Sequence, residues 1–354
     1  MRYAFTLSVL ILSIPALAAG TTYLVRPDGS GDYPTIQEAI FACEHGDVVE
    51  LADGLYTGPG NCDLTNSETE VLIRSQSGQA ATCVIDCQGS QSVPHRFATL
   101  VITGEQGRTA WGLRNLTIVG GWTGIGGAVV VADWAGPEIT GCIFRDNHAN
   151  EYGGAVFGAV GLPVIADCWF ESNSSARGGA IGGLDDCVFQ VSGCTFYANQ
   201  ADEGGAVYSY YDKGSSFTGC TFVANGAALG CGLSLQGAQS IALDRCLVAH
   251  GEGGAAIHVA AVGGVLLSCC DLFGNAGGDW VGTIGDQLLL AGNLCADPLL
   301  CDPPAGNLYL HADSPCAPWT PPNPQCDLIG AWPVGCGPIG VERTSWGGLK
   351  NLFR

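Results

Sequence analysis

Asp186 and Asp212 are the residues of this 354-residue chain best suited, by type and spacing, to hold a ligand. They stand 26 residues apart, an interval that recurs through the chain. Two carboxylates held side by side repel each other unless one is protonated or a cation lies between them. Ca²⁺ binds several carboxylate oxygens, so the pair is a candidate calcium site, and no other cofactor is expected. The alternative is a solvated acidic patch that includes Asp185 and has Lys213 as its counterion.

Three tyrosines, Tyr208, Tyr210 and Tyr211, stand immediately before Asp212. Exposed aromatic rings beside carboxylates suit sugar binding, because a ring offers an apolar face and the carboxylates accept hydrogen bonds. We therefore treat the three as candidate ligand-binding residues. The alternative is that their rings pack within the fold. The histidines fall at unrelated positions, so no catalytic residue set is expected.

A 26-residue repeat decides how these residues are placed. A Cys-x-Phe element recurs, and an Asn follows each Phe after two further residues, as at Cys142, Cys168, Cys194 and Cys220. A Gly-Gly-Ala element with Val or Ile after it recurs at residues 153–156, 178–181 and 204–207. The flanking segments alternate with period 2, as strands do. Coils of about 26 residues, regular over about 116–275, predict an all-β, single-stranded right-handed parallel β-helix.

Residues 26 apart should then stack directly above one another in columns. The Phe column beginning at Phe144 is expected inside, and the Asn column beginning at Asn147 is expected at a bend where Asn adopts left-handed geometry. Stacked positions hold their Cβ atoms about 4.8 Å apart with parallel directions, whereas a disulfide needs about 3.8 Å. The Cys column beginning at Cys142 therefore predicts buried thiols rather than disulfides.

The basic residues between 116 and 300 are Arg145, Arg177, Lys213 and Arg245. They follow the Cys of their own coil at four different offsets, which places them on different faces. A lyase acting on an acidic polysaccharide needs a proton acceptor and cations in one cleft. The sequence therefore argues against a lyase site. Arg177 is expected to pair with Glu203, and a turn one residue longer lets its other neighbour slip from Glu151 to Tyr152.

The ends of the chain differ from the repeat. Arg2, an apolar run over 7–17 and Ala-Leu-Ala at 16–18 predict a signal peptide over 1–18, so the protein is expected to be secreted or on the outer cell surface. Residues 19–336 form the β-helix domain, in which the Cys- and Pro-rich closing region 295–336 is where disulfides are expected. Residues 337–354 carry apolar and basic side chains and are a candidate sorting or anchoring segment.

Charge limits the partners of the protein. Lys and Arg number 13 against 33 Asp and Glu, which gives a formal net charge of −20. Phosphate would repel such a chain, so no nucleic-acid partner is expected. After the signal peptide no segment is long and apolar enough for a membrane helix. We expect a monomer whose partner is a polysaccharide or a cell-surface glycan.

Three resemblances add to this interpretation. The Phe-x-x-Asn and Gly-Gly-Ala elements over about 116–275 resemble the repeats of the chlamydial polymorphic outer membrane proteins, and the whole pattern resembles β-helix proteins of the pectin lyase-like fold. Residues 28–40 resemble the opening of pectin methylesterases. Physically this opening is a turn and an amphipathic helix that would place Ile36, Ala39 and Ile40 against the first coil and cover the end of the solenoid.

The sequence leaves catalysis open but argues against it. The catalytic motifs of pectin methylesterases, polygalacturonases and pectate lyases are not matched. The favoured hypothesis is an exported, non-catalytic cell-surface, adhesion or carbohydrate-binding protein. One alternative is a polysaccharide-degrading enzyme, pectate lyase-like and Ca²⁺-assisted, with an unfamiliar site near Asp186 and Asp212. Another is a structural surface spacer without a ligand. The fold alone does not choose among these.

Overall fold

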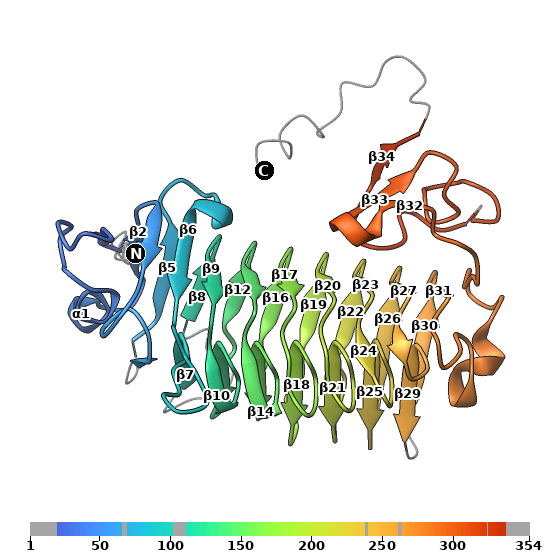
Figure 1. Cartoon of the computed structure of the whole chain (residues 1–354), viewed down its shortest axis with the longest axis horizontal. Coiled ribbons are helices and arrows are strands. Elements are labelled where there is room, and N and C mark those ends of the chain that lie inside the picture. Colours follow the sequence, from blue (N-terminus) through green and yellow to red (C-terminus); the bar gives the residue numbers. More distant parts are fainter. Residues whose placement is uncertain are drawn as a thin grey trace, which may run out of the picture.

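The structure, a computed structural model, describes residues 20–65, 69–101, 111–237, 240–260, 264–323 and 325–337. The predicted signal peptide lies outside these residues, as does the C-terminal tail from residue 338 onward. Three long parallel sheets run side by side along the solenoid in the described part of the chain (Figure 1). No helix there is long and apolar enough to cross a membrane.

Each complete coil contributes one strand to each sheet, and the coils at the two ends contribute fewer. The first sheet comprises β1 (Thr22–Val25), β2 (Asp47–Leu51), β5 (Val71–Ser75), β8 (Trp111–Arg114), β12 (Glu138–Thr140), β16 (Val164–Ala166), β19 (Gln190–Ser192), β22 (Ser216–Thr218), β26 (Ile241–Asp244) and β30 (Val265–Ser268). The second comprises β3 (Gly54–Tyr56), β6 (Cys83–Asp86), β9 (Thr117–Val119), β13 (Ile143–Arg145), β17 (Trp169–Glu171), β20 (Thr195–Tyr197), β23 (Thr221–Val223), β27 (Leu247–Ala249) and β31 (Asp271–Phe273). The third comprises β4 (Leu64–Thr65), β7 (Ala98–Val101), β11 (Val129–Ala132), β15 (Val156–Ala159), β18 (Ile181–Leu184), β21 (Val207–Tyr210), β25 (Leu233–Gln236) and β29 (Ile257–Ala260).

Short elements complete the coils. Two-stranded pairs form between β10 (Trp122–Ile125) and β14 (His148–Tyr152), and between β24 (Gly226–Ala227) and β28 (Glu252–Gly253). The helical elements of the described residues are α1 (Ile36–Ala42), η1 (Ala80–Thr82), η2 (Gly282–Gln287) and η3 (Pro303–Ala305). Helix α1 begins after Thr35, whose side chain accepts from the Glu38 amide, and it buries Ile36, Ala39 and Ile40 as predicted.

The register confirms the 26-residue stacking. Phe144 pairs with Phe170, Phe170 with Phe196, and Phe196 with Phe222 in successive strands of the second sheet. The four rings are buried and stack almost parallel, with centroids 5.0, 4.9 and 4.5 Å apart. Each such pair stabilises the fold by roughly 0.5–1.5 kcal/mol beyond its area burial. This stack forms the centre of the core.

The Asn column forms a buried hydrogen-bond ladder. The Asn147 side chain donates to Asn173 Oδ1 over 3.0 Å, and Asn173 and Asn199 repeat the contact with the next coil. One detail of the sequence prediction is wrong: the left-handed residue is the one before each Asn, for example Asp146 with φ of 55°. The Asn stays outside that region and uses its amide to satisfy backbone groups of neighbouring coils.

The Cys column forms the predicted ladder of buried free thiols, made of Cys142, Cys168, Cys194, Cys220, Cys246 and Cys270. Each thiol lies near backbone carbonyls; Cys168 Sγ, for example, is 3.2 Å from the Ala166 oxygen. Burial raises the pKa of Cys194 well above its ordinary value. These thiols are therefore packing groups that fill the corner beside the Phe stack, and they do not act as nucleophiles.

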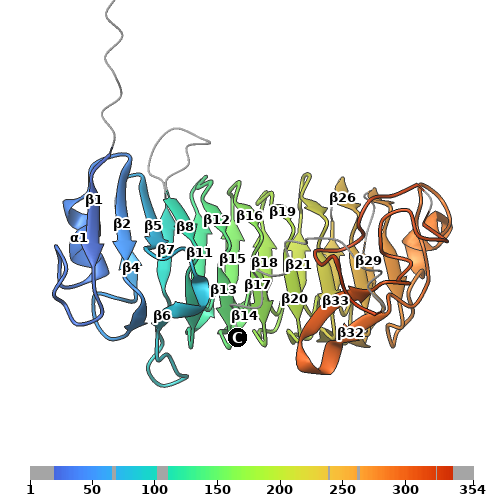
Figure 2. The ribbon, with the colours of Figure 1, turned by 90° about the horizontal axis from the view of Figure 1, so that it is seen from above.

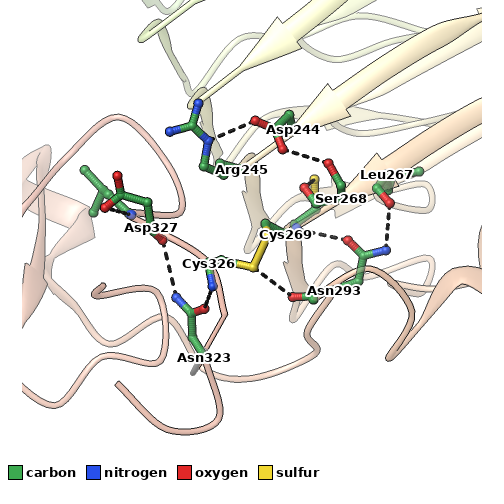
Figure 3. Close-up of a disulfide and its surroundings, with 12 residues drawn as sticks. Asp244, Arg245, Leu267, Ser268, Cys269, Asn293, Asn323, Cys326 and Asp327 are labelled. Carbon is green, nitrogen blue, oxygen red and sulfur yellow. Dashed lines mark hydrogen bonds and ion pairs between the residues drawn. A yellow bond between two sulfur atoms is a disulfide. The ribbon is translucent and has the colours of Figure 1, made fainter. Parts of the chain in front are cut away.

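The closing region folds back over the solenoid. We call residues 295–337 the C-terminal flap; it carries β32 (Leu300–Asp302), β33 (Asn307–His311) and β34 (Val334–Cys336) (Figure 2). Its apolar side chains, including Leu308 and Leu310, pack on Val223 and Leu247 of the second sheet. The Cys301–Cys336 disulfide closes the flap itself, as the sequence predicted for this region. Cys326 instead bonds to Cys269 of the last coils, outside the predicted segment (Figure 3).

Candidate functional site

Asp212 is buried and serves the loop that follows β21. Its Oδ2 accepts a hydrogen bond from Ser209 Oγ over 2.8 Å. Its Oδ1 accepts from the backbone amides of Gly214 and Ser215 over 2.9 and 2.8 Å. The side chain is 1% exposed, so the interpretation of a solvated carboxylate is wrong for this residue. Asp212 acts as a loop-fixing acceptor, because both of its oxygens have partners within its own loop.

Asp186 has a different partner from Asp212. Its Oδ2 lies 2.6 Å from Lys213 Nζ in a half-exposed ion pair, so Lys213 is the counterion, as the sequence suggested. The strands leading to the two aspartates are in register, with Ile181 beside Val207. Across the described residues, no group of three or more His, Cys, Asp or Glu side chains is arranged to hold a metal ion. The calcium site therefore stays a prediction.

The three candidate tyrosines separate into two environments. Tyr208 is buried, and burial, followed by the charge of Glu203, raises its pKa to about 12, so the phenol stays neutral at physiological pH. Tyr210 and Tyr211 pack edge to face, with ring centroids 4.3 Å apart. Tyr211 is 53% exposed. Tyr210 and Tyr211 can therefore meet a ligand directly, whereas Tyr208 supports the residues around it.

Tyr152 joins Tyr208 on the outer face of the third sheet. The longer turn in its coil lets it pair with Arg177 in the next coil, which is the slip that the sequence allowed. Between Phe157 and Tyr208 the column has Gly182, where an added Cβ would lie 2.6 Å from the Gly153 nitrogen and 3.1 Å from Tyr152 Cβ. The missing side chain lets the backbone at Tyr152 and Gly153 approach closely, and the Tyr152 ring centroid lies 6.0 Å from Phe157 and 5.9 Å from Tyr208.

Arg177 lies across these rings. Its guanidinium carbon is 5.3 Å from the Tyr152 centroid and 5.9 Å from that of Tyr208. Arg177 Nη1 donates to the Tyr152 hydroxyl over 3.1 Å, and Nε lies 3.6 Å from Glu203 Oε1. Gln236 donates to the second oxygen of Glu203. Stacking on two rings is worth roughly 0.5–1 kcal/mol per contact at a half-exposed site, so the guanidinium is held in place.

We call this cluster the aromatic–arginine platform; it consists of Tyr152, Phe157, Arg177, Glu203, Tyr208 and Gln236. Gln236 also lies beside Tyr210 in the register of β21 and β25, so the platform continues into the exposed Tyr210–Tyr211 pair. Sequence reasoning found the tyrosines and the Arg177–Glu203 pair separately. The longer turn and Gly182 were the signals that could have joined them.

Other basic side chains of the solenoid also have acidic partners. Arg74 pairs with Glu50 at 2.9 Å, Arg145 with Asp146 at 3.6 Å, and Arg245 with Asp244 at 2.9 Å. Arg145 ends β13 of the second sheet and Arg245 directly follows β26 of the first sheet, so these two lie on different faces, as their offsets predicted. His148 stacks on Trp122 with centroids 3.9 Å apart and bonds Ser174 Oγ over 2.9 Å, without a carboxylate partner among the described residues. The geometry brings these groups into local pairs and not into one cleft.

Comparison with known protein families supports the fold. The family model of the right-handed β-helix region matches residues 126–294, which confirms the predicted architecture. No curated protein matches the chain. The resemblance to polymorphic outer membrane protein repeats is not tested by these findings and stays a prediction.

Two solved structures with some similarity are lyases. A pectate lyase, Pel9A, is 15% identical with a TM-score of 0.44, and the match covers 73% of this chain and 64% of that one. A mannuronic acid specific polysaccharide family 6 lyase from human gut microbiota is 11% identical with a TM-score of 0.27, covering 77% and 85%. At these levels of similarity the matches do not bear on activity or substrate.

Proposed function

We propose that this protein binds glycan chains without cleaving them, through the aromatic–arginine platform and the adjacent Tyr210–Tyr211 pair. The observation that carries the proposal is the platform itself, where Arg177, whose side chain is 39% exposed, is held across Tyr152 and Tyr208. Sugar rings present apolar C–H faces bordered by hydroxyls. Aromatic faces next to fixed donors and acceptors complement both features.

The pairing of charged groups supports a non-catalytic role. A lyase needs a base that is free to take a proton, and a glycosidase needs two carboxyl groups facing the same bond. Arg177 and Lys213, the bases nearest the platform, are both engaged by carboxylates. Asp212 is committed to its own loop. The groups near the platform thus hold the structure together, which favours binding over cleavage.

An exported location fits this role and is part of the proposal. The predicted signal peptide supports export, and the Cys269–Cys326 and Cys301–Cys336 disulfides suit an oxidising compartment. Outside the cell, a stiff solenoid would meet polysaccharide of a matrix or a neighbouring cell.

The test is affinity electrophoresis of the mature protein through gels containing dissolved polysaccharides, together with an assay for cleavage products. We expect retardation by at least one polymer without products. Tyr152→Ala should weaken that retardation by about fivefold or more, the usual effect of losing a central aromatic contact. Arg177→Gln should weaken it as well, whereas Arg145→Gln, an arginine–carboxylate pair on the second sheet, is the matched control. Product formation that survives in Tyr152→Ala would contradict the proposal.

A further inference from the structure

The platform offers unused hydrogen-bonding atoms of both kinds. Arg177 uses Nη1 for Tyr152 and Nε for Glu203, and no partner for Nη2 is found among the described residues. Gln236 uses Nε2 for Glu203, and its Oε1 likewise has no partner in the described part of the chain. One free donor and one free acceptor therefore flank Glu203. A hydroxyl group both donates and accepts, so it can use both atoms, whereas a carboxylate only accepts.

The charge of Arg177 is already balanced where a ligand would meet it. Glu203 lies 3.6 Å from Nε, with side-chain exposures of 39% for Arg177 and 22% for Glu203. A ligand carboxylate that approached Arg177 would also approach Glu203. It would have to displace Glu203 or lie beside a like charge, and both cost binding free energy.

The surroundings add to this repulsion. Asp185 and Asp186 follow β18 next to the tyrosine pair, and Lys213 is bound to Asp186. The whole chain carries a formal net charge of −20. Fields of this sign lower the local concentration of polyanions and slow their association, most strongly at low salt.

From these features we infer that the platform recognises an uncharged, hydroxyl-rich glycan and rejects polyuronates, an inference that rests on the proposed glycan-binding function. Tyr152 and the guanidinium plane of Arg177 supply the stacking surface. Arg177 Nη2 and Gln236 Oε1 supply the hydroxyl contacts. Glu203 is the specificity-determining residue, because it neutralises the only cation of the platform.

The experiment compares the wild-type protein with Glu203→Gln on two sets of polymers at low salt. The neutral set is xylan, mixed-linkage β-glucan and galactomannan, and the anionic set is polygalacturonate and alginate. We expect the wild-type protein to bind a neutral polymer about tenfold or more tightly than either polyuronate. Glu203→Gln keeps the shape and a hydrogen-bonding group but leaves Arg177 uncompensated, so the ratio of polyuronate affinity to neutral-polymer affinity should rise by about tenfold.

The possible outcomes distinguish failure of this inference from failure of the proposed glycan-binding function. Polyuronate binding by the wild-type protein that is as tight as neutral binding, and that is lost in Tyr152→Ala, would overturn the inference and leave the proposed function in place. Unchanged selectivity in Glu203→Gln would also overturn it. Failure to bind any polymer in either set would overturn both. A circular dichroism spectrum of each variant confirms that the solenoid is folded.

Discussion

The second and third sheets of the solenoid both present aromatic side chains on their outer faces, but these side chains have different neighbours. Trp169 and Tyr197 of the second sheet are packed against the C-terminal flap. Tyr152 and Tyr208, on the third sheet side, contact each other and Arg177. One aromatic face has thus become an internal interface with the flap. On the other face Tyr208 is buried, and the Arg177 side chain, 39% exposed, lies at the surface.

The contacts explain why the second face is closed. Trp332 of the flap meets the Trp169 ring at 5.6 Å and donates to Thr195 Oγ1 over 2.8 Å. The Tyr197 hydroxyl donates to the Pro303 carbonyl over 2.9 Å. Aromatic rings and a tyrosine hydroxyl occur on both faces, but on the second sheet their partners are fixed parts of the flap. The proposed binding face differs in that no contact of the platform with the flap is found among the described residues.

The strongest way to disturb the contact between the second sheet and the flap, which we call the closed face, is to remove the Cys269–Cys326 disulfide. It joins residues 57 positions apart and ties the flap to the last coils. Changing both to Ser should destabilise the flap by about 4 kcal/mol, the loop-closure contribution expected for that separation. Hydrogen exchange at Ile329 and Gly330 should accelerate, with glycan binding unchanged. Unchanged exchange would mean that the apolar contacts alone hold the flap.

Removing Trp332 should have the next largest effect. Trp332→Ala loses the contacts to Trp169 and Tyr309 and the hydrogen bond to Thr195, so we expect a loss of about 2–3 kcal/mol in unfolding free energy. Denaturant titration measures it. Trp319→Ala is the matched control, because that tryptophan belongs to the same flap and is 67% exposed. Equal losses in the two variants would contradict the assigned role of Trp332.

Asp271 makes the closed face sensitive to pH. The carboxyl is fully buried and accepts from the Ala296 amide and Cys316 Sγ of the flap over 3.0 and 3.2 Å. Burial raises the pKa of Asp271 from 3.8 to about 6. The folded state therefore binds the proton more tightly than the unfolded state does. The resulting contribution to the free energy of unfolding, roughly 2–3 kcal/mol, is full below pH 4 and is lost as the pH rises through 6.

Thermal unfolding across pH 4–7 measures this dependence. Asp271→Asn keeps the shape of the side chain and cannot titrate, so the slope between pH 4 and 6 should flatten in that variant. A slope that persists unchanged would assign the titration to another group. Glu203, the carboxylate of the platform, is 22% exposed and is not part of the flap contact, so glycan affinity should not follow the same curve.

The smallest effects should come from two matched hydroxyl deletions. Tyr197→Phe removes the bond to Pro303 and should cost the flap about 1 kcal/mol, leaving glycan affinity intact. Tyr152→Phe removes the bond to Arg177 and should weaken glycan binding by a few-fold, leaving flap exchange intact. Both variants are measured by hydrogen exchange of the flap and by glycan binding. If Tyr197→Phe changed glycan affinity, or Tyr152→Phe changed flap exchange, the two faces would be coupled.

Periodic features of the fold could be predicted from the sequence because stacking repeats them. Phe144 and its successors, the buried thiols and the Arg177–Tyr152 slip follow from counting residues between coils. Packing of the tyrosine rings within the fold was one of two alternatives from the sequence. Which ring is buried could not be told, since the burial of Tyr208 goes with the Tyr152 ring, whose centroid lies 5.9 Å away. The docking of the flap could not be predicted from the sequence, because Trp332 and Thr195 are 137 positions apart and no repeat interval links them.

The flap also changes the order in which the coils of the solenoid unfold. In a linear array each coil touches only its neighbours, so coils can melt one after another from an open end. The flap bonds to Thr195, Thr221 and Asp271, which belong to coils that are not all adjacent. Fraying of the last coil therefore requires release of contacts several coils away. The C-terminal half should unfold as one cooperative block, and melting from the end of the array should begin at the N-terminal side.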